Sequence, residues 1–80
     1  MKREEVFERL TEIFRDVFDD ETIELSEETS SEDIEGWDSL AHINLIGAVE
    51  QEFSVRIPMS RVVTMKNVGE MADTVLELAE

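Results

Sequence analysis

Apolar residues recur every three or four positions in three separate stretches of the chain, which is the spacing of one face of an α-helix. The first stretch covers residues 4–19, where acidic residues fill most positions between the apolar ones. Its apolar face consists of Val6, Leu10, Ile13, Phe14, Val17 and Phe18. Because no glycine or proline interrupts this stretch, the pattern predicts one uninterrupted amphipathic helix.

The second helical stretch runs from Ser39 to about Phe53. Its expected buried face is formed by Ile43, Ile46, Val49 and Phe53. His42 and Leu45 are expected at the edges of that face. Pro58 disfavours helical geometry at the residue before it, so this helix is expected to have ended by Ile57.

The third helical stretch begins at Asn67-Val68-Gly69-Glu70, which has the form of a capping box with asparagine as the N-cap. Its expected buried stripe is formed by Val68, Met71, Ala72, Val75, Leu76 and Ala79. A short helical turn is predicted over residues 60–63. Residues 20–37 are polar and lack periodicity, which indicates a long loop. Its apolar residues, the expected anchors of the loop on the core, are Ile23, Leu25, Ile34 and Trp37.

No stretch alternates in the way that a strand requires, so the predicted fold class is all-α. We expect one domain over residues 1–80: a small four-helix bundle of three longer helices and one short helix, with a long loop between helices one and two.

The chain is strongly acidic, with 21 acidic residues against 7 basic ones and a net charge of −14. This charge disfavours nucleic acid and anionic membranes as partners and favours basic protein surfaces. The chain has no cysteine, which excludes disulfides and a Cys-ligated zinc site. It shows no signal peptide and no apolar run of membrane-spanning length, so we expect a cytoplasmic protein without membrane insertion.

The candidate chemistry lies at Gly36-Trp37-Asp38-Ser39-Leu40, where a turn leads into the second helix. A serine in the first turn of a helix lies where backbone N–H groups lack partners and the helix dipole favours a phosphate. The sequence around Ser39 lacks a nucleophile elbow, and His42 is the only histidine of the chain. Ser39 is therefore better placed to carry a group than to attack one, although Asp-Ser before an apolar run is by itself also an ordinary N-cap. No second ligand stands at a useful spacing from His42, so no metal site is expected.

In this context the chain resembles the acyl carrier proteins over nearly its whole length. The segments that carry the resemblance are Asp38-Ser39-Leu40, Glu50-Gln51-Glu52-Phe53, Ile57-Pro58 and Lys66-Asn67-Val68-Gly69-Glu70. The resemblance implies that a phosphopantetheinyl transferase, with magnesium in its own active site, moves 4′-phosphopantetheine from coenzyme A onto Ser39. It also implies a flanking recognition role for Asp38 and Leu40, and a carrier that is not itself an enzyme.

The implied function is to carry acyl groups as thioesters between the acyl-transferring and acyl-modifying enzymes of fatty-acid, polyketide or a related specialised biosynthesis. The expected docking surface, on the outward side of the second helix and on the short helix, consists of Leu40, Ala41, Asn44, Gly47, Ala48 and Arg61. Residues 39–49 contain no acid, whereas carriers of fatty-acid synthesis typically have acids there, and Arg61 stands where the family often has an acid. These departures favour a dedicated carrier for a specialised pathway. We expect it to be a stand-alone carrier and a monomer.

Two other functions fit the same sequence: an aminoacyl or peptidyl carrier, and an unmodified acidic adaptor that binds through its helix faces. An EF-hand is disfavoured, because a calcium loop aligned on Gly36 would place Ser31 and His42 at its first and last ligand positions. An enzyme is disfavoured as well, because the acidic residues form no recognisable acid–base pair.

Overall fold

The computed structural model describes residues 1–79 and contains four helices. They are α1 (Arg3–Val17), α2 (Ser39–Phe53), α3 (Met59–Val62) and α4 (Val68–Leu78). No strand occurs within residues 1–79, so the predicted all-α class is confirmed. The predicted bounds of α2 are correct, α1 ends two residues before the predicted position, and α3 begins one residue before it.

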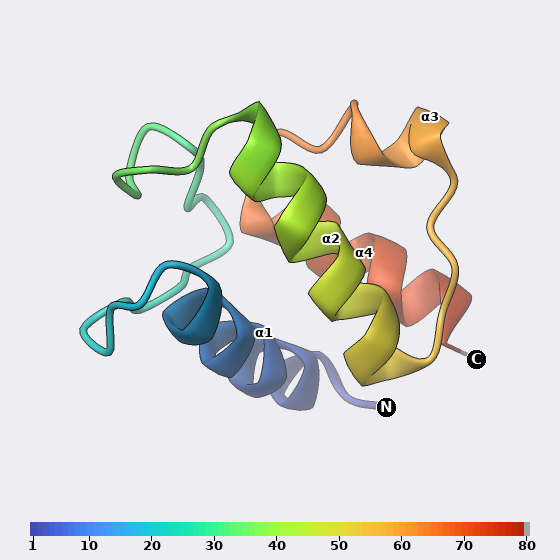
Figure 1. Ribbon diagram of the computed structural model, residues 1–80. Helices are drawn as coiled ribbons and strands as arrows, with labels where there is room; N and C mark the ends of the chain where they lie inside the picture. Colours follow the sequence, from blue (N-terminus) through green and yellow to red (C-terminus); the bar gives the residue numbers. More distant parts are fainter. Residues whose placement is uncertain (80) are drawn as a thin grey trace.

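The three longer helices form a bundle in which α1 packs against both α2 and α4. In Figure 1, α2 crosses in front of α4, α3 lies beside the upper part of the bundle, and the two ends of the chain lie on the same side. The largest fully buried side chains form the centre of the core: Phe14, Leu10, Leu45, Met71, Val6, Val49, Val68 and Val75. None of the described helices is long and apolar enough to cross a bilayer.

The buried face of α2 differs from the predicted one. Ile43, expected in the core, is 50% exposed, whereas Leu45, expected at the edge, is fully buried. At 100° per residue, Ile43 lies about a third of a turn away from the mean direction in which Leu45, Val49 and Phe53 point. The bundle therefore buries the face that contains Leu45, because only that orientation places Leu45, Ile46, Val49 and Phe53 in the core together.

The long loop, residues 18–38, is held to the bundle by apolar anchors and backbone hydrogen bonds. Ile23 and Ile34 are buried, and Leu25 and Trp37 pack partly buried against the core, as predicted. The amides of Val68 and Gly69 donate to the carbonyls of Thr29 and Glu27, at 2.8 and 3.0 Å. A Cβ atom on Gly69 would stand 2.8 Å from the Glu27 carbonyl oxygen, so this close approach of loop and helix requires glycine.

Two helix ends are fixed by local side-chain contacts. Asn67 caps α4 by accepting a hydrogen bond from the Glu70 amide at 2.9 Å, which confirms the predicted N-cap. After α2, the Glu50 carboxylate accepts a hydrogen bond from the Ile57 amide at 2.7 Å. This contact ties the connector before α3 to the body of α2.

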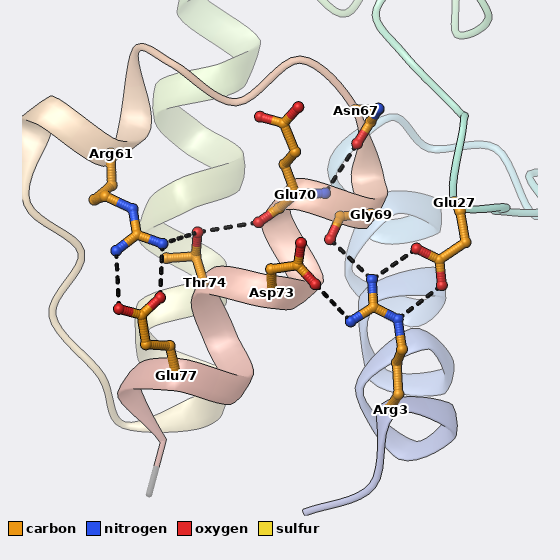
Figure 2. Close-up of polar contacts among 9 residues, drawn as sticks. All are labelled: Arg3, Glu27, Arg61, Asn67, Gly69, Glu70, Asp73, Thr74 and Glu77. Atoms are coloured by element: carbon orange, nitrogen blue, oxygen red, sulfur yellow. Dashed lines mark hydrogen bonds and ion pairs between the residues drawn. The ribbon is translucent and has the colours of Figure 1, made fainter.

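Two arginines connect segments that are distant in the sequence (Figure 2). Arg3 of α1 donates to both carboxylate oxygens of Glu27 in the loop, and to Asp73 and the Gly69 carbonyl in α4. Arg61 of α3 donates to Glu77 and to the Thr74 hydroxyl of α4. Arg3 therefore joins the loop to two helices, and Arg61 joins the short helix to α4.

The Arg3 contact predicts a pH-dependent contribution to stability. Its hydrogen bonds hold the pKa of Glu27 below the ordinary value of 4.5. Because the folded state favours the ionised carboxylate, the contribution is present above about pH 4.5 and is lost as the pH falls through the lower, folded-state pKa. Glu27→Gln should therefore lower the melting temperature near neutral pH, and its difference from the wild type should disappear in acid.

The matched control is Glu28→Gln, which removes the same charge at an exposed neighbouring position. Thermal unfolding of the three proteins across the acid range separates the Arg3 contact from the general relief of negative charge. A Glu27→Gln difference that matches the control, or that grows as the pH falls, would contradict the assignment.

Candidate functional site

A tight turn places Ser39 at the start of α2. Gly36 has φ +89°, a conformation that L side chains rarely adopt, and the Trp37 amide donates to the Ile34 carbonyl at 3.2 Å. Asp38 is the N-cap: its carboxylate accepts from the Ala41 amide at 2.8 Å, and its carbonyl accepts from the His42 amide at 2.9 Å. Ser39 is thus the first residue of the helix, as the sequence predicts.

The surroundings of Ser39 suit a phosphate group. Ser39 is exposed, and the first turn of α2 contains no acidic residue. Within residues 1–79 the amides of Ser39 and Leu40 have no hydrogen-bond acceptor, as is usual for the first turn of a helix. These N–H groups and the helix dipole favour an anion attached to the Ser39 oxygen.

A cleft of about 480 Å³ opens beside Ser39, between the start of α2 and the segment from α3 to α4. Its lining consists of Ser31, Trp37, Asp38, Ser39, His42, Ile43, Val62, Val63, Met65 and Lys66. Five of these, Trp37, Ile43, Val62, Val63 and Met65, are apolar or aromatic side chains. Lys66 contributes a basic group to the lining, in a chain of net charge −14. The cleft therefore offers an apolar surface and a cation to a flexible group attached at Ser39.

The inner side of the cleft is formed by Trp37 and His42. The Trp37 indole N–H donates to His42 Nδ1 at 3.1 Å, and His42 Nε2 lies 3.0 Å from the Val62 carbonyl oxygen. His42 is partly buried and bonded on both sides. It is a packed histidine at the edge of the buried face of α2, as the helical spacing predicts.

The other sequence-predicted site residues fall into two groups. Leu40 is 72% exposed, and Asn44 and Gly47 are exposed on the same outward side of α2. Ala41 and Ala48 are partly buried. Arg61 is held against α4 by Glu77 and Thr74, and it does not line the cleft (Figure 2).

Residues that the sequence did not single out as site residues also line the cleft. Ile43 was assigned to the core, while Val63, which is 71% exposed, and Lys66 were not assigned to the site. The exposure of an apolar residue in a short helix carries no local sequence signal, because it depends on how α3 packs. These residues become recognisable only when α2 and α3 lie side by side.

The site contains few groups that could perform acid–base chemistry. Among residues 1–79, no group of three or more histidine or acidic side chains is arranged to hold a metal ion. Next to Ser39 the arrangement provides a capped helix start, an exposed hydroxyl and an adjoining cleft. These features suit the covalent attachment and partial shelter of a group.

Comparisons with known proteins give a consistent result. Residues 8–75 match the family described as "Phosphopantetheine attachment site". An acyl carrier protein of Acidothermus cellulolyticus is 34% identical over 91% of this chain and 87% of its own length. An acyl carrier protein of Saccharopolyspora erythraea is 28% identical over 98% of this chain and 82% of its own length. The solution structure of a holo acyl carrier protein from Geobacter metallireducens is 44% identical and superimposes with a TM-score of 0.86, covering 91% of this chain and 84% of that one.

Proposed function

The chain belongs to the acyl carrier proteins, the family of phosphopantetheine attachment sites, and we propose that Ser39 is its attachment residue. The observation that carries this proposal is the exposed Ser39 hydroxyl on the first residue of α2, capped by Asp38 and adjoining a cleft of about 480 Å³. The cargo is an acyl group from fatty-acid, polyketide or a related specialised biosynthesis.

The residues present fit a 4′-phosphopantetheine group. The phosphate would lie at the positive end of the α2 dipole, and the apolar lining with Lys66 would face the arm. In the attachment step the Ser39 oxygen would form a bond to the phosphorus that carries the pantetheine arm, and the pyrophosphate bond of coenzyme A would break. Adenosine 3′,5′-bisphosphate would leave with the bridging oxygen, and the proton of the Ser39 hydroxyl would be released. The bound group supplies a terminal thiol on which acyl groups are carried as thioesters. The chain itself positions that group and presents it to enzymes; it is a carrier without catalytic activity.

Asp38 has two roles in this proposal. One carboxylate oxygen holds the Ala41 amide, which fixes the start of the helix. Asp38 also directly precedes the attachment residue, where the family pattern places an aspartate next to the transferase magnesium. Asp38→Asn keeps a good N-cap and removes the charge, so it separates the two roles.

Intact-mass analysis tests the proposal. The purified chain is incubated with coenzyme A, magnesium and a transferase of broad specificity, and it should gain the mass of one phosphopantetheinyl group. The unmodified adaptor predicts no gain. Failure with several transferases that modify a control carrier would overturn the attachment.

The partner enzymes dock on an uncharged surface in this proposal. Leu40, Asn44 and Gly47 are exposed on the outward side of α2, and residues 39–49 contain no acid. A Cβ atom on Gly47 would meet nothing within 4 Å, so the space over this turn is open to a partner. Ala41 and Ala48 lie beside them. A surface of small and uncharged side chains favours close packing with a partner over ion pairing. Arg61, neutralised by Glu77, lies on the adjoining α3.

This surface predicts weak recognition by the enzymes of housekeeping fatty-acid synthesis. We expect a fatty-acid ketosynthase with a basic docking patch to bind the holo form at least about tenfold more weakly than it binds its own carrier, because complementary charges raise the association rate. Titration by calorimetry at low and physiological ionic strength measures this difference. Tight binding that weakens steeply with salt would contradict an uncharged docking surface.

A further inference from the structure

Three residues form a bonded row along the inner side of the Ser39 cleft. Trp37 in the loop donates its indole N–H to His42 Nδ1 at 3.1 Å, and His42 Nε2 lies 3.0 Å from the Val62 carbonyl oxygen. Because Nδ1 accepts from Trp37, the ring proton belongs on Nε2, which donates to Val62. His42 thus connects α2 to α3 through a single ring whose two nitrogens are both occupied.

The row is anchored at its loop end by two aromatic side chains, Phe14 of α1 and Phe18 directly after it. The Trp37 ring lies edge-on to Phe14 at a centroid distance of 5.2 Å and contacts Phe18 at 6.4 Å. Phe14 is fully buried. Trp37 is therefore fixed against the core, and it fixes His42 in turn.

The cleft ends at this row and does not continue into the bundle. Of the residues that line it, only Val62 belongs to the buried core. The fully buried side chains of α2 and α4, among them Leu45, Val68 and Met71, do not line it. Because protein interiors are close-packed, a hydrocarbon chain that entered the core here would have to separate His42 from Val62 and displace core side chains.

We infer that His42 determines which acyl groups this carrier shelters, by closing the passage between α2 and α3. Short acyl groups lie with the arm in the surface cleft. Longer chains do not enter the core; they extend from the cleft into solvent, where a partner enzyme can bind them. This inference rests on the proposed function, since it concerns the group attached at Ser39. His42 acts as a positioning and specificity residue through its bonds to Trp37 and Val62.

The test loads the chain with acetyl and octanoyl forms of the arm, using a transferase that accepts the corresponding acyl coenzyme A. In the wild type, both forms should melt at nearly the same temperature, and the methyl NMR signals of Leu45 and Met71 should not move between them. In His42→Ala the octanoyl form should melt about 4 °C or more above the acetyl form, with shifted core methyl signals, because the chain now enters the bundle. His42→Leu, which keeps the volume of the side chain without its hydrogen bonds, should give an intermediate rise.

Thr64→Ala is the matched control. It removes hydroxyl hydrogen bonds to the Ser60 and Arg61 carbonyls at the end of α3 without changing the lining of the cleft. Thr64→Ala weakens the end of α3, but its acetyl and octanoyl forms should still melt at nearly the same temperature, as in the wild type. Core methyl shifts or strong stabilisation of the octanoyl wild type would overturn the inference, and this measurement does not depend on any variant folding. Absence of mass gain would instead refute attachment at Ser39, so the two failures are distinguishable.

Discussion

Ser39→Ala is expected to abolish phosphopantetheine attachment completely while leaving the fold and its stability unchanged. The substitution removes the only oxygen that can form the bond to phosphorus at this position. It removes little else, because Ser39 is exposed and the cap of α2 is provided by the Asp38 side chain. Surface substitutions of this kind change the free energy of unfolding by about 0.5 kcal/mol or less.

Intact mass after the transferase reaction measures the loss, and thermal unfolding by circular dichroism confirms the fold. Ser60→Ala is the matched control, because Ser60 is likewise an exposed serine in the first turn of a helix, α3, but lacks the preceding aspartate cap. The control should be modified as fully as the wild type. Residual mass gain in Ser39→Ala, or its loss in Ser60→Ala, would place the attachment elsewhere.

The sequence predicts the helices and their caps well because these features depend on neighbouring residues. Asp38 and Asn67 each accept a hydrogen bond from an amide three residues later, and such a contact is determined locally. Gly36 before Trp37 likewise marks a turn that needs a positive φ. These local signals also placed Ser39 at the start of α2.

The remaining features depend on contacts between residues that are far apart in the chain. Arg3 meets Glu27 and Asp73 across 24 and 70 positions, and His42 meets the Val62 carbonyl across 20. No periodicity indicates such pairs. With 21 acidic residues against 7 basic ones, the sequence offers many possible partners for each exposed arginine. The cleft beside Ser39 is equally non-local, since its walls come from the loop, α2 and the α3–α4 segment.

The buried face of α2 is a feature for which the sequence pattern was misleading. Residues 39–53 contain apolar or small side chains around much of the helix, so several orientations satisfy the three-and-four spacing. The helix can therefore be rotated about its axis by a small fraction of a turn and still bury an apolar stripe. Packing against α1 and α4 decides between the orientations, and it buries Leu45 in preference to Ile43.

Leu45→Ala should therefore be among the most destabilising substitutions in the chain, whereas Ile43→Ala should be nearly neutral. Leu45 is fully buried, and a leucine-to-alanine change in such a position costs about 2–5 kcal/mol through lost burial and the cavity left behind. Proteins have a total stability of only about 5–15 kcal/mol, so Leu45→Ala should remove a large share of it. Ile43 is 50% exposed and should lose about 1 kcal/mol or less.

Urea denaturation of the two variants, followed by circular dichroism on the unmodified protein, measures both values. A larger loss for Ile43→Ala than for Leu45→Ala would mean that α2 is rotated towards the face that the sequence pattern favoured. The rotation matters for function, because burying Ile43 would remove it from the lining of the cleft beside Ser39. With Leu45 in the core, Ile43 is free to contact an attached arm, so Ile43→Ala should weaken shelter of the arm without weakening the fold.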